Sequence, residues 1–242
     1  MNNIFSFRFS TFVTLNIISL LLVSSWSYGA TREYWDWLDR WVFDATNPLL
    51  NELGGVWSWF WAVLSMRIAD LIPFFIILWF FYAKGVIFES KDRLVGLIGF
   101  ALLGVVMLFV RELLDFYVDY NHLNRASPTM LIGEAVRLSS IYPDFGLKDY
   151  SGDSFPGDHA AVLFTWLGYC LFFVRNKWTP WILFVVVLFV MPRLMAGAHW
   201  MSDIMVGGIS TALTALAFGL YTPLLNTPQK ILNKITNRIL RK

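Results

Sequence analysis

Six long apolar runs constrain this chain more than any other feature of its sequence. They cover roughly residues 10–27, 69–84, 94–114, 160–175, 179–197 and 203–222. A helix needs about 20 mostly apolar residues to cross a bilayer. Short charged segments separate the runs, and only 15% of the residues are charged. The sequence therefore predicts an all-α polytopic membrane protein, a bundle of six transmembrane helices without a separate soluble domain.

The segments between the runs fall into a basic set and an acidic set. The basic set comprises the N-terminus, residues 84–93, residues 175–178 and the tail after 226. The acidic set holds nearly all the carboxylates and comprises residues 31–68, 115–159 and 193–203. Lysine and arginine are enriched in cytoplasmic loops, so the basic set, with the C-terminus, should face the cytoplasm. The acidic set should face the outer side.

The N-terminal run has a second interpretation. Arg8, the apolar stretch after it and the small residues ending at Ala30 also fit a signal peptide. Tyr28 fits that interpretation poorly, because its position favours a small side chain. Cleavage would leave the remaining topology unchanged, since residue 31 lies on the outer side in either case.

Two amphipathic segments are expected at the membrane surfaces. Residues 31–62 interleave tryptophans with carboxylates, which predicts one or two helices in the outer surface. They would either guide lipid to a site or serve as simple anchors. The membrane domain is expected to comprise residues 1–226. The tail, residues 227–242, is expected to form a basic amphipathic helix on the cytoplasmic side, with Thr227 as its cap and Pro228 at its first position.

One boundary between an apolar run and polar chain reads Arg193-Leu-Met-Ala-Gly-Ala-His199-Trp-Met-Ser-Asp203. His199 and Asp203 are four residues apart, so they share one face of a helix. A carboxylate that accepts from one imidazole nitrogen leaves the other free as a base or nucleophile. A turn at Gly197 must fold Arg193 back toward them, and its planar guanidinium suits a phosphate. Such a pair alone is most often only structural.

A second boundary supports the functional interpretation. His159 opens an apolar run directly after Pro156-Gly157-Asp158. A glycine at a helix N-terminus lets backbone N–H groups approach an anion. Arg125, in Arg125-Ala-Ser-Pro128, adds a further cation on the same face. A phosphoryl group held there could be attacked by His199, with protonated His159 supplying a proton to the leaving oxygen.

Other polar residues carry weaker signals. We expect His122 to be an exposed loop histidine, and Arg67 with Asp70 to be a pair at a helix end rather than a site. The single Cys170 lies in an apolar run, so it cannot form an intramolecular disulfide and should be a buried core residue. The charge asymmetry fits a membrane protein and not a nucleic-acid binder.

The three clusters together resemble the three motifs of the type 2 phosphatidic acid phosphatase superfamily. Arg125-Ala-Ser-Pro128 follows the third run, Ser154-Phe-Pro-Gly-Asp-His159 opens the fourth, and Pro192 to Asp203 joins the fifth and sixth. By layout the resemblance covers roughly residues 55–225. Its specificity resides in the motifs, of which Arg-x5-His-x3-Asp and Pro-Gly-x-His together make a strong signal.

This resemblance implies a role for each motif residue. The histidine matching His199 is the superfamily's nucleophile and forms a phosphohistidine, and the aspartate matching Asp203 orients it. The histidine matching His159 is the general acid. The arginines matching Arg125 and Arg193 bind phosphate. The resemblance also implies that neither a metal nor a cofactor is needed.

The chain departs from the superfamily pattern in three places. Val118 stands where the first motif begins with a lysine, Pro156-Gly157-Asp158-His159 replaces Pro-Ser-Gly-His, and Pro192 replaces a serine. The missing lysine and the added Asp158 weaken the positive field at the site. The residues at 125–129, 153–159 and 197–207 are instead similar to a lipid A phosphotransferase branch of Gram-negative inner membranes.

That branch implies two lipid substrates. Undecaprenyl diphosphate is the donor of its distal phosphate, and the 1-phosphate of lipid A is the acceptor, on the periplasmic face of the inner membrane. We expect substrate contacts from Ser154, Gly157 and Asp158, and from Arg137 and Lys148 in the loop 129–153. A lipid phosphatase with water as acceptor is the second hypothesis. A non-enzymatic lipid transporter or scaffold is the third.

Overall fold

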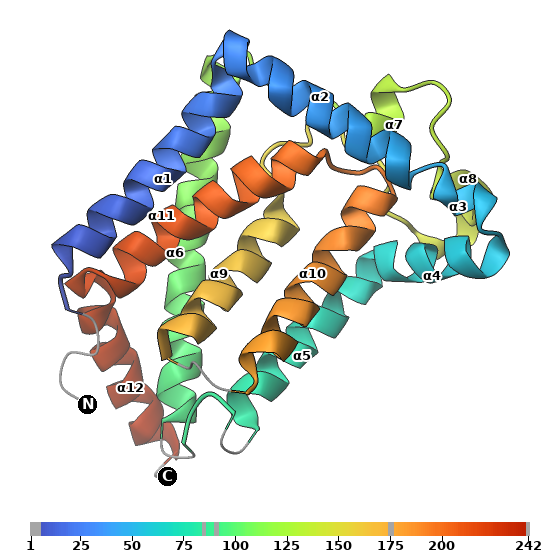
Figure 1. Cartoon of the computed structure of the whole chain (residues 1–242). Helices are drawn as coiled ribbons and strands as arrows, with labels where there is room; N and C mark the ends of the chain where they lie inside the picture. Colours follow the sequence, from blue (N-terminus) through green and yellow to red (C-terminus); the bar gives the residue numbers. More distant parts are fainter. Residues whose placement is uncertain (1–5, 84–85, 90–91, 174–176, 241–242) are drawn as a thin grey trace.

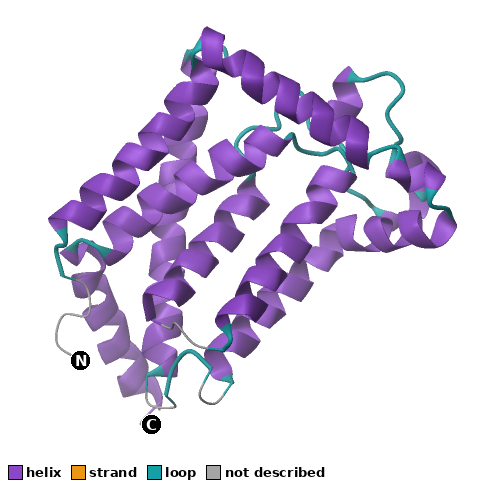
Figure 2. Cartoon of the chain, in the orientation of Figure 1, coloured by secondary structure: helices purple, strands orange, loops and turns teal. Residues whose placement is uncertain are grey.

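The structure, a computed structural model, describes residues 6–83, 86–89, 92–173 and 177–240. Helices and the loops between them make up this part of the chain (Figure 2). Its one β feature is an isolated antiparallel bridge between Met66 and Leu147. The predicted all-α class is therefore confirmed for the described residues.

Each of the six predicted apolar runs forms a helix. They are α1 (Phe9–Ser27), α5 (Leu71–Tyr82), α6 (Arg93–Tyr120), α9 (Asp158–Phe173), α10 (Thr179–Met195) and α11 (Ile209–Leu220), which follows the π-helical turn η3 (Asp203–Gly208). Among the described residues, α1, α6 and the continuous stretch Asp203–Leu220 are long and apolar enough to cross a membrane. Helices α9 and α10 are apolar but shorter. The chain is a helical membrane protein, and six crossings remain a prediction.

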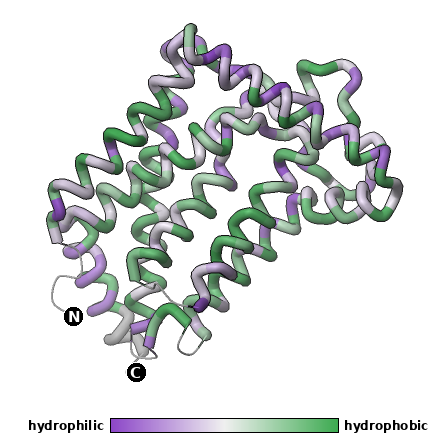
Figure 3. The backbone as a smooth tube through the Cα atoms, in the orientation of Figure 1, coloured by the Kyte–Doolittle hydropathy of each residue, from purple (hydrophilic) through white to green (hydrophobic). Residues whose placement is uncertain are grey.

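Shorter helices cover one end of this bundle. Helix α2 crosses the ends of the long helices, with α4 and the small helices beside it (Figure 1). Their bounds are α2 (Gly29–Thr46), α3 (Leu49–Glu52), α4 (Gly55–Ser65), α7 (Pro128–Leu131) and α8 (Leu138–Ile141). Helix α12 (Asn226–Leu240) lies at the opposite end. Figure 3 shows hydrophobic residues concentrated along α5 and α10, and hydrophilic ones along α2 and α12.

Close packing around α9 brings distant segments of the chain together. Trp166, Tyr169 and the free Cys170 are fully buried on this helix, as expected for Cys170. A Cβ on Gly208 would lie 2.7 Å from the Cβ of Ala160, closer than side chains tolerate. Glycine there lets η3 approach the first turn of α9. The second and third motif segments therefore meet at this contact.

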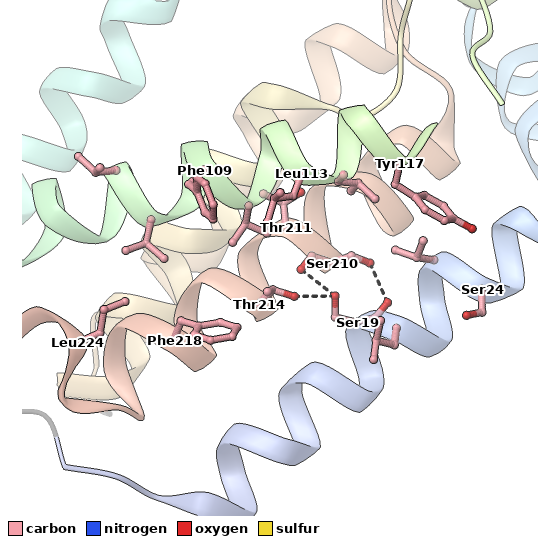
Figure 4. A pocket seen from close by; sticks show the side chains of 16 residues that line it. Ser19, Ser24, Phe109, Leu113, Tyr117, Ser210, Thr211, Thr214, Phe218 and Leu224 are labelled. Carbon is pink, nitrogen blue, oxygen red and sulfur yellow. Dashed lines mark hydrogen bonds between the residues drawn. The ribbon is translucent and has the colours of Figure 1, made fainter. Parts of the chain in front are cut away.

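A large apolar cavity lies between α1, α6 and α11, and neither His159 nor His199 lines it. Its volume is about 740 Å³. Hydroxyl groups link two of its walls: Thr214 Oγ1 donates to Ser19 Oγ at 2.8 Å, and Ser19 Oγ donates to the Ser210 carbonyl at 3.0 Å (Figure 4). Hydroxyls that satisfy one another inside a bundle hold helices together. This polar contact joins α1 to α11.

Candidate active site

A tight turn after α10 returns the chain to Arg193. Gly197 adopts a left-handed backbone conformation with φ of 71°, and a Cβ there would lie 2.6 Å from the Thr129 Cγ2. The backbone N–H groups of Ala198 and His199 both donate to the Arg193 carbonyl, at 3.0 and 3.2 Å. The turn predicted at Gly197 is confirmed, and it places His199 beside Arg193.

The His199 side chain is buried, with 6% of its surface exposed. Its Nδ1 lies 2.7 Å from the Ser154 carbonyl oxygen and 3.5 Å from Asp203 Oδ2. A carbonyl can only accept, so Nδ1 carries the proton in the neutral ring and Nε2 keeps its lone pair. Nε2 is buried and has no hydrogen-bond partner. The ring is therefore oriented as a nucleophile requires, with the Ser154 carbonyl, rather than Asp203, as its nearest acceptor.

Four of the predicted site residues, Gly157, His159, Arg193 and His199, meet at one small cavity. It measures about 10 Å³ and is lined by Gly157, His159, Ala160, Val190, Arg193, His199 and Ile204. The structure thus brings the proposed nucleophile, the proposed general acid and one of the two predicted phosphate-binding arginines to a common space.

Arg193 is held rigidly at this cavity. Only 3% of the residue is exposed. One of its terminal nitrogens donates to the Ser65 and Lys148 carbonyls at 3.1 and 3.4 Å, and the other donates to both oxygens of Asp70 at 2.7 and 2.9 Å. A guanidinium fixed in this way presents a defined geometry to an anion.

Asp70 also binds the second histidine. Its Oδ2 lies 2.9 Å from His159 Nε2, so one carboxylate bridges His159 and Arg193. Burial acts to raise the pKa of Asp70, but the His159 hydrogen bond and the Arg193 charge outweigh it and lower that pKa. The expectation that Asp70 only pairs with Arg67 at a helix end is wrong. Asp70 lies at the start of the apolar run 69–84, and an ionisable residue in such a run is a signal of a functional site.

Arg125 lies outside the cavity lining. Its guanidinium contacts Ser202 Oγ and binds Asp203 Oδ1 at 3.0 Å. It also binds Asp39 at 2.7 Å and Asp36 at 3.3 Å. Burial raises the pKa of Asp39, against the opposing effects of Arg125 and of hydrogen bonds from Ser202. Arg125 and Asp203 are thus brought together behind His199, and the phosphate-binding role of Arg125 stays a prediction.

The predicted contacts in the second motif have local partners. The Gly157 N–H donates to the Asp203 carbonyl at 3.0 Å, so this amide is not free for an anion. Ser154 is buried, and its hydroxyl donates to the Arg125 carbonyl at 3.2 Å. Asp158 pairs with Arg111 on α6, with Nε and Oδ1 2.9 Å apart. These three residues shape the site, and their contacts with substrate remain predictions.

Two cations of the loop 129–153 lie at different distances from this chemistry. The Lys148 backbone accepts a hydrogen bond from Arg193, and burial, followed by the Arg193 charge, lowers the pKa of the Lys148 side chain. Arg137 lies over the Tyr150 ring, with its guanidinium carbon 5.0 Å from the ring centroid. In contrast, the position of the absent lysine carries no charge: Val118 is buried there in an apolar cluster with Trp26, Phe155 and Val206. Of these two cations, Lys148 is therefore the one that interacts with Arg193.

The fold and the site define a class: a helical membrane protein with two histidines and a buried arginine around one cavity. Residues 118–225 match the PAP2 superfamily. Over 216 residues the chain is 31% identical to the Lipid A 1-diphosphate synthase of Escherichia coli (strain K12). The matched region covers 88% of this chain and 87% of the E. coli protein. No solved structure matches the chain. The chain belongs to the PAP2 superfamily, as its three motifs predict, and its activity concerns lipid phosphates.

Proposed function

We propose that the protein is a phosphotransferase that moves the distal phosphate of undecaprenyl diphosphate to the 1-phosphate of lipid A. The observation that carries the proposal is the unpartnered Nε2 of His199, which belongs to a ring whose other nitrogen is fixed by the Ser154 carbonyl. Because His199 lines the same cavity as His159 and Arg193, the nucleophile, a proton donor and a phosphate ligand are available together.

In the first step, His199 Nε2 attacks the distal phosphorus of the diphosphate. An N–P bond forms, and the bond between phosphorus and the bridging oxygen breaks. Protonated His159 gives its proton to that oxygen, so undecaprenyl phosphate leaves. Arg193 neutralises charge on the phosphoryl oxygens in the transition state.

In the second step, an oxygen of the acceptor's 1-phosphate attacks the phosphohistidine. A new P–O bond forms, the N–P bond breaks, and His199 recovers its lone pair. A phosphate oxygen already carries negative charge and needs no base, whereas water must lose a proton. Where the acceptor phosphate is protonated, His159 takes up that proton.

A third cavity, next to His159, supports a lipid substrate. It measures about 470 Å³ and lies between α5, α6, α9 and α10. Its lining is mostly apolar, with Phe74, Ile77 and Phe100 among its side chains, and it also includes Asp70, His159 and Arg193. A hydrocarbon chain in this cavity would bring an attached phosphate to the histidines. The similarity to the Lipid A 1-diphosphate synthase of E. coli supports lipid A as the acceptor.

The test uses purified protein in detergent with undecaprenyl diphosphate labelled on its distal phosphate, with and without lipid A. We expect label on lipid A, and an acid-labile phosphoprotein intermediate that is lost in His199→Ala. His122→Ala is the matched control, because His122 is exposed and lines no described cavity near the site. Label found only as free phosphate would indicate a lipid phosphatase. Unchanged function in His199→Ala would favour a transporter or scaffold.

A further inference from the structure

Helix α2 presents two different faces where it crosses the end of the bundle near the turn between α10 and α11 (Figure 1). Trp37 and Trp41 are 66% and 58% exposed. Asp39 and Phe43, four residues apart on the other face, are buried. The Phe43 ring lies 6.3 Å from that of Trp200. The inner face of α2 is therefore packed on the segment that carries His199.

Asp39 makes the main polar contacts of that inner face. Only 1% of the residue is exposed. Its carboxylate accepts hydrogen bonds from the Ser202 N–H at 2.7 Å and the Ser202 hydroxyl at 2.8 Å. It also lies 2.7 Å from a terminal nitrogen of Arg125. Both oxygens of this buried carboxylate therefore have donors, and the contacts hold Ser202 and Arg125 in place.

These contacts continue to the nucleophile. The same Arg125 nitrogen binds Asp203 Oδ1 at 3.0 Å. The other oxygen of Asp203 accepts from the Trp200 N–H at 2.7 Å and lies 3.5 Å from His199 Nδ1. A chain of polar contacts thus runs from α2 through one guanidinium to Asp203, which lies beside the ring of His199.

The charges in this chain favour the covalent step. Asp39 and Asp203 are both buried, and the single guanidinium of Arg125 lies between them, so the carboxylates outnumber the cation. When His199 Nε2 bonds to phosphorus, the imidazole ring gains positive charge. An excess of negative charge at low dielectric stabilises that ring. The same excess would repel a phosphate from Arg125.

We propose that Asp39 is a positioning residue of the reaction, acting through Ser202 and Arg125 on Asp203 and His199. Arg125 is then the link between Asp39 and Asp203. Helix α2, which contains none of the three motifs, completes the active site. The inference rests on the proposed phosphohistidine step.

The test is Asp39→Asn, which keeps the size of the side chain and an oxygen acceptor but removes the charge. With donor labelled on its distal phosphate, we expect the rate of phosphoprotein formation and kcat to fall about 10- to 100-fold, as for loss of a hydrogen bond between charged groups. KM for the donor and inhibition by inorganic phosphate should not change. Asp44→Asn is the matched control, because Asp44 makes an exposed pair with Arg40 on the same helix. It should behave as wild type.

Ser202→Ala provides a second variant should Asp39→Asn not fold. It removes one donor to Asp39 and leaves α2 intact, so we expect a smaller decrease of kcat, again at constant KM. A normal kcat in a folded variant, or a change confined to KM or to phosphate inhibition, would overturn the inference alone. Wild-type protein that forms no phosphoprotein would overturn the proposed function, and this inference with it.

Discussion

The two arginines predicted to bind phosphate lie in different surroundings. Arg193 lines the cavity shared by the two histidines, and its acceptors are one carboxylate, Asp70, and two backbone carbonyls. Arg125 is absent from that lining and lies among three carboxylates, those of Asp36, Asp39 and Asp203. Arg193 thus has one carboxylate partner, whereas Arg125 has three. The same residue type, found in two motifs, thus lies in two different electrostatic surroundings, and we expect its two copies to differ in their effect on phosphate binding.

The largest effect on activity is expected for substitution of Arg193, and comparing it with substitution of Arg125 tests whether the two arginines differ in phosphate binding. Arg193→Lys replaces the planar guanidinium with a single ammonium group. We therefore expect activity to fall about 10²- to 10³-fold, as when one hydrogen-bond donor to the transition state is removed. Inhibition by inorganic phosphate should weaken in parallel. Arg125→Lys should lower kcat while leaving the inhibition constant of phosphate unchanged. Steady-state kinetics with added phosphate provides both values. Equal weakening of phosphate inhibition in both variants would contradict the comparison.

The carboxylate on the cavity side offers the next test. Asp70→Asn removes the charge that holds Arg193 and His159, and we expect activity to fall about 10- to 100-fold. The pKa of Asp70 is lowered in the folded protein. The Asp70 carboxylate therefore stabilises the fold at any pH above its usual pKa, and this stabilisation is lost as the pH falls through the lowered pKa. The difference in Tm between wild type and Asp70→Asn should therefore be constant above about pH 4 and should shrink below it. A difference that grows on acidification would contradict this assignment.

Much of the fold could be predicted because it depends on local composition. The apolar runs predict every long helix of the bundle, and Gly197 predicts the turn that returns His199 to Arg193. The number of membrane crossings is harder to predict from the sequence. Helix α5 has only 12 residues and α9 only 16, so run length alone does not decide whether each spans a bilayer.

The motif residues could be named from the sequence, but their partners could not. Asp70 meets Arg193 across 123 residues, and Asp39 meets Ser202 across 163. Periodicity and spacing report neighbours on one helix, so such pairs leave no pattern in a single sequence. The missing lysine at Val118 suggested a weaker positive field. The structure adds that Lys148 lies close enough to Arg193 for the two charges to interact.

The smallest expected effect concerns that lysine. The lowered pKa of Lys148 means that its positive charge is lost at a lower pH than that of an exposed lysine. If Lys148 attracts the phosphates of a substrate, KM of wild-type protein should rise at alkaline pH. Lys148→Arg keeps the charge, so its KM should stay constant over the same range. Lys148→Met should show the raised KM at every pH, by no more than about fivefold, because partly exposed ion pairs contribute little. A pH-independent KM in wild type would place Lys148 outside substrate binding and leave Arg193 as the principal cation of the cavity.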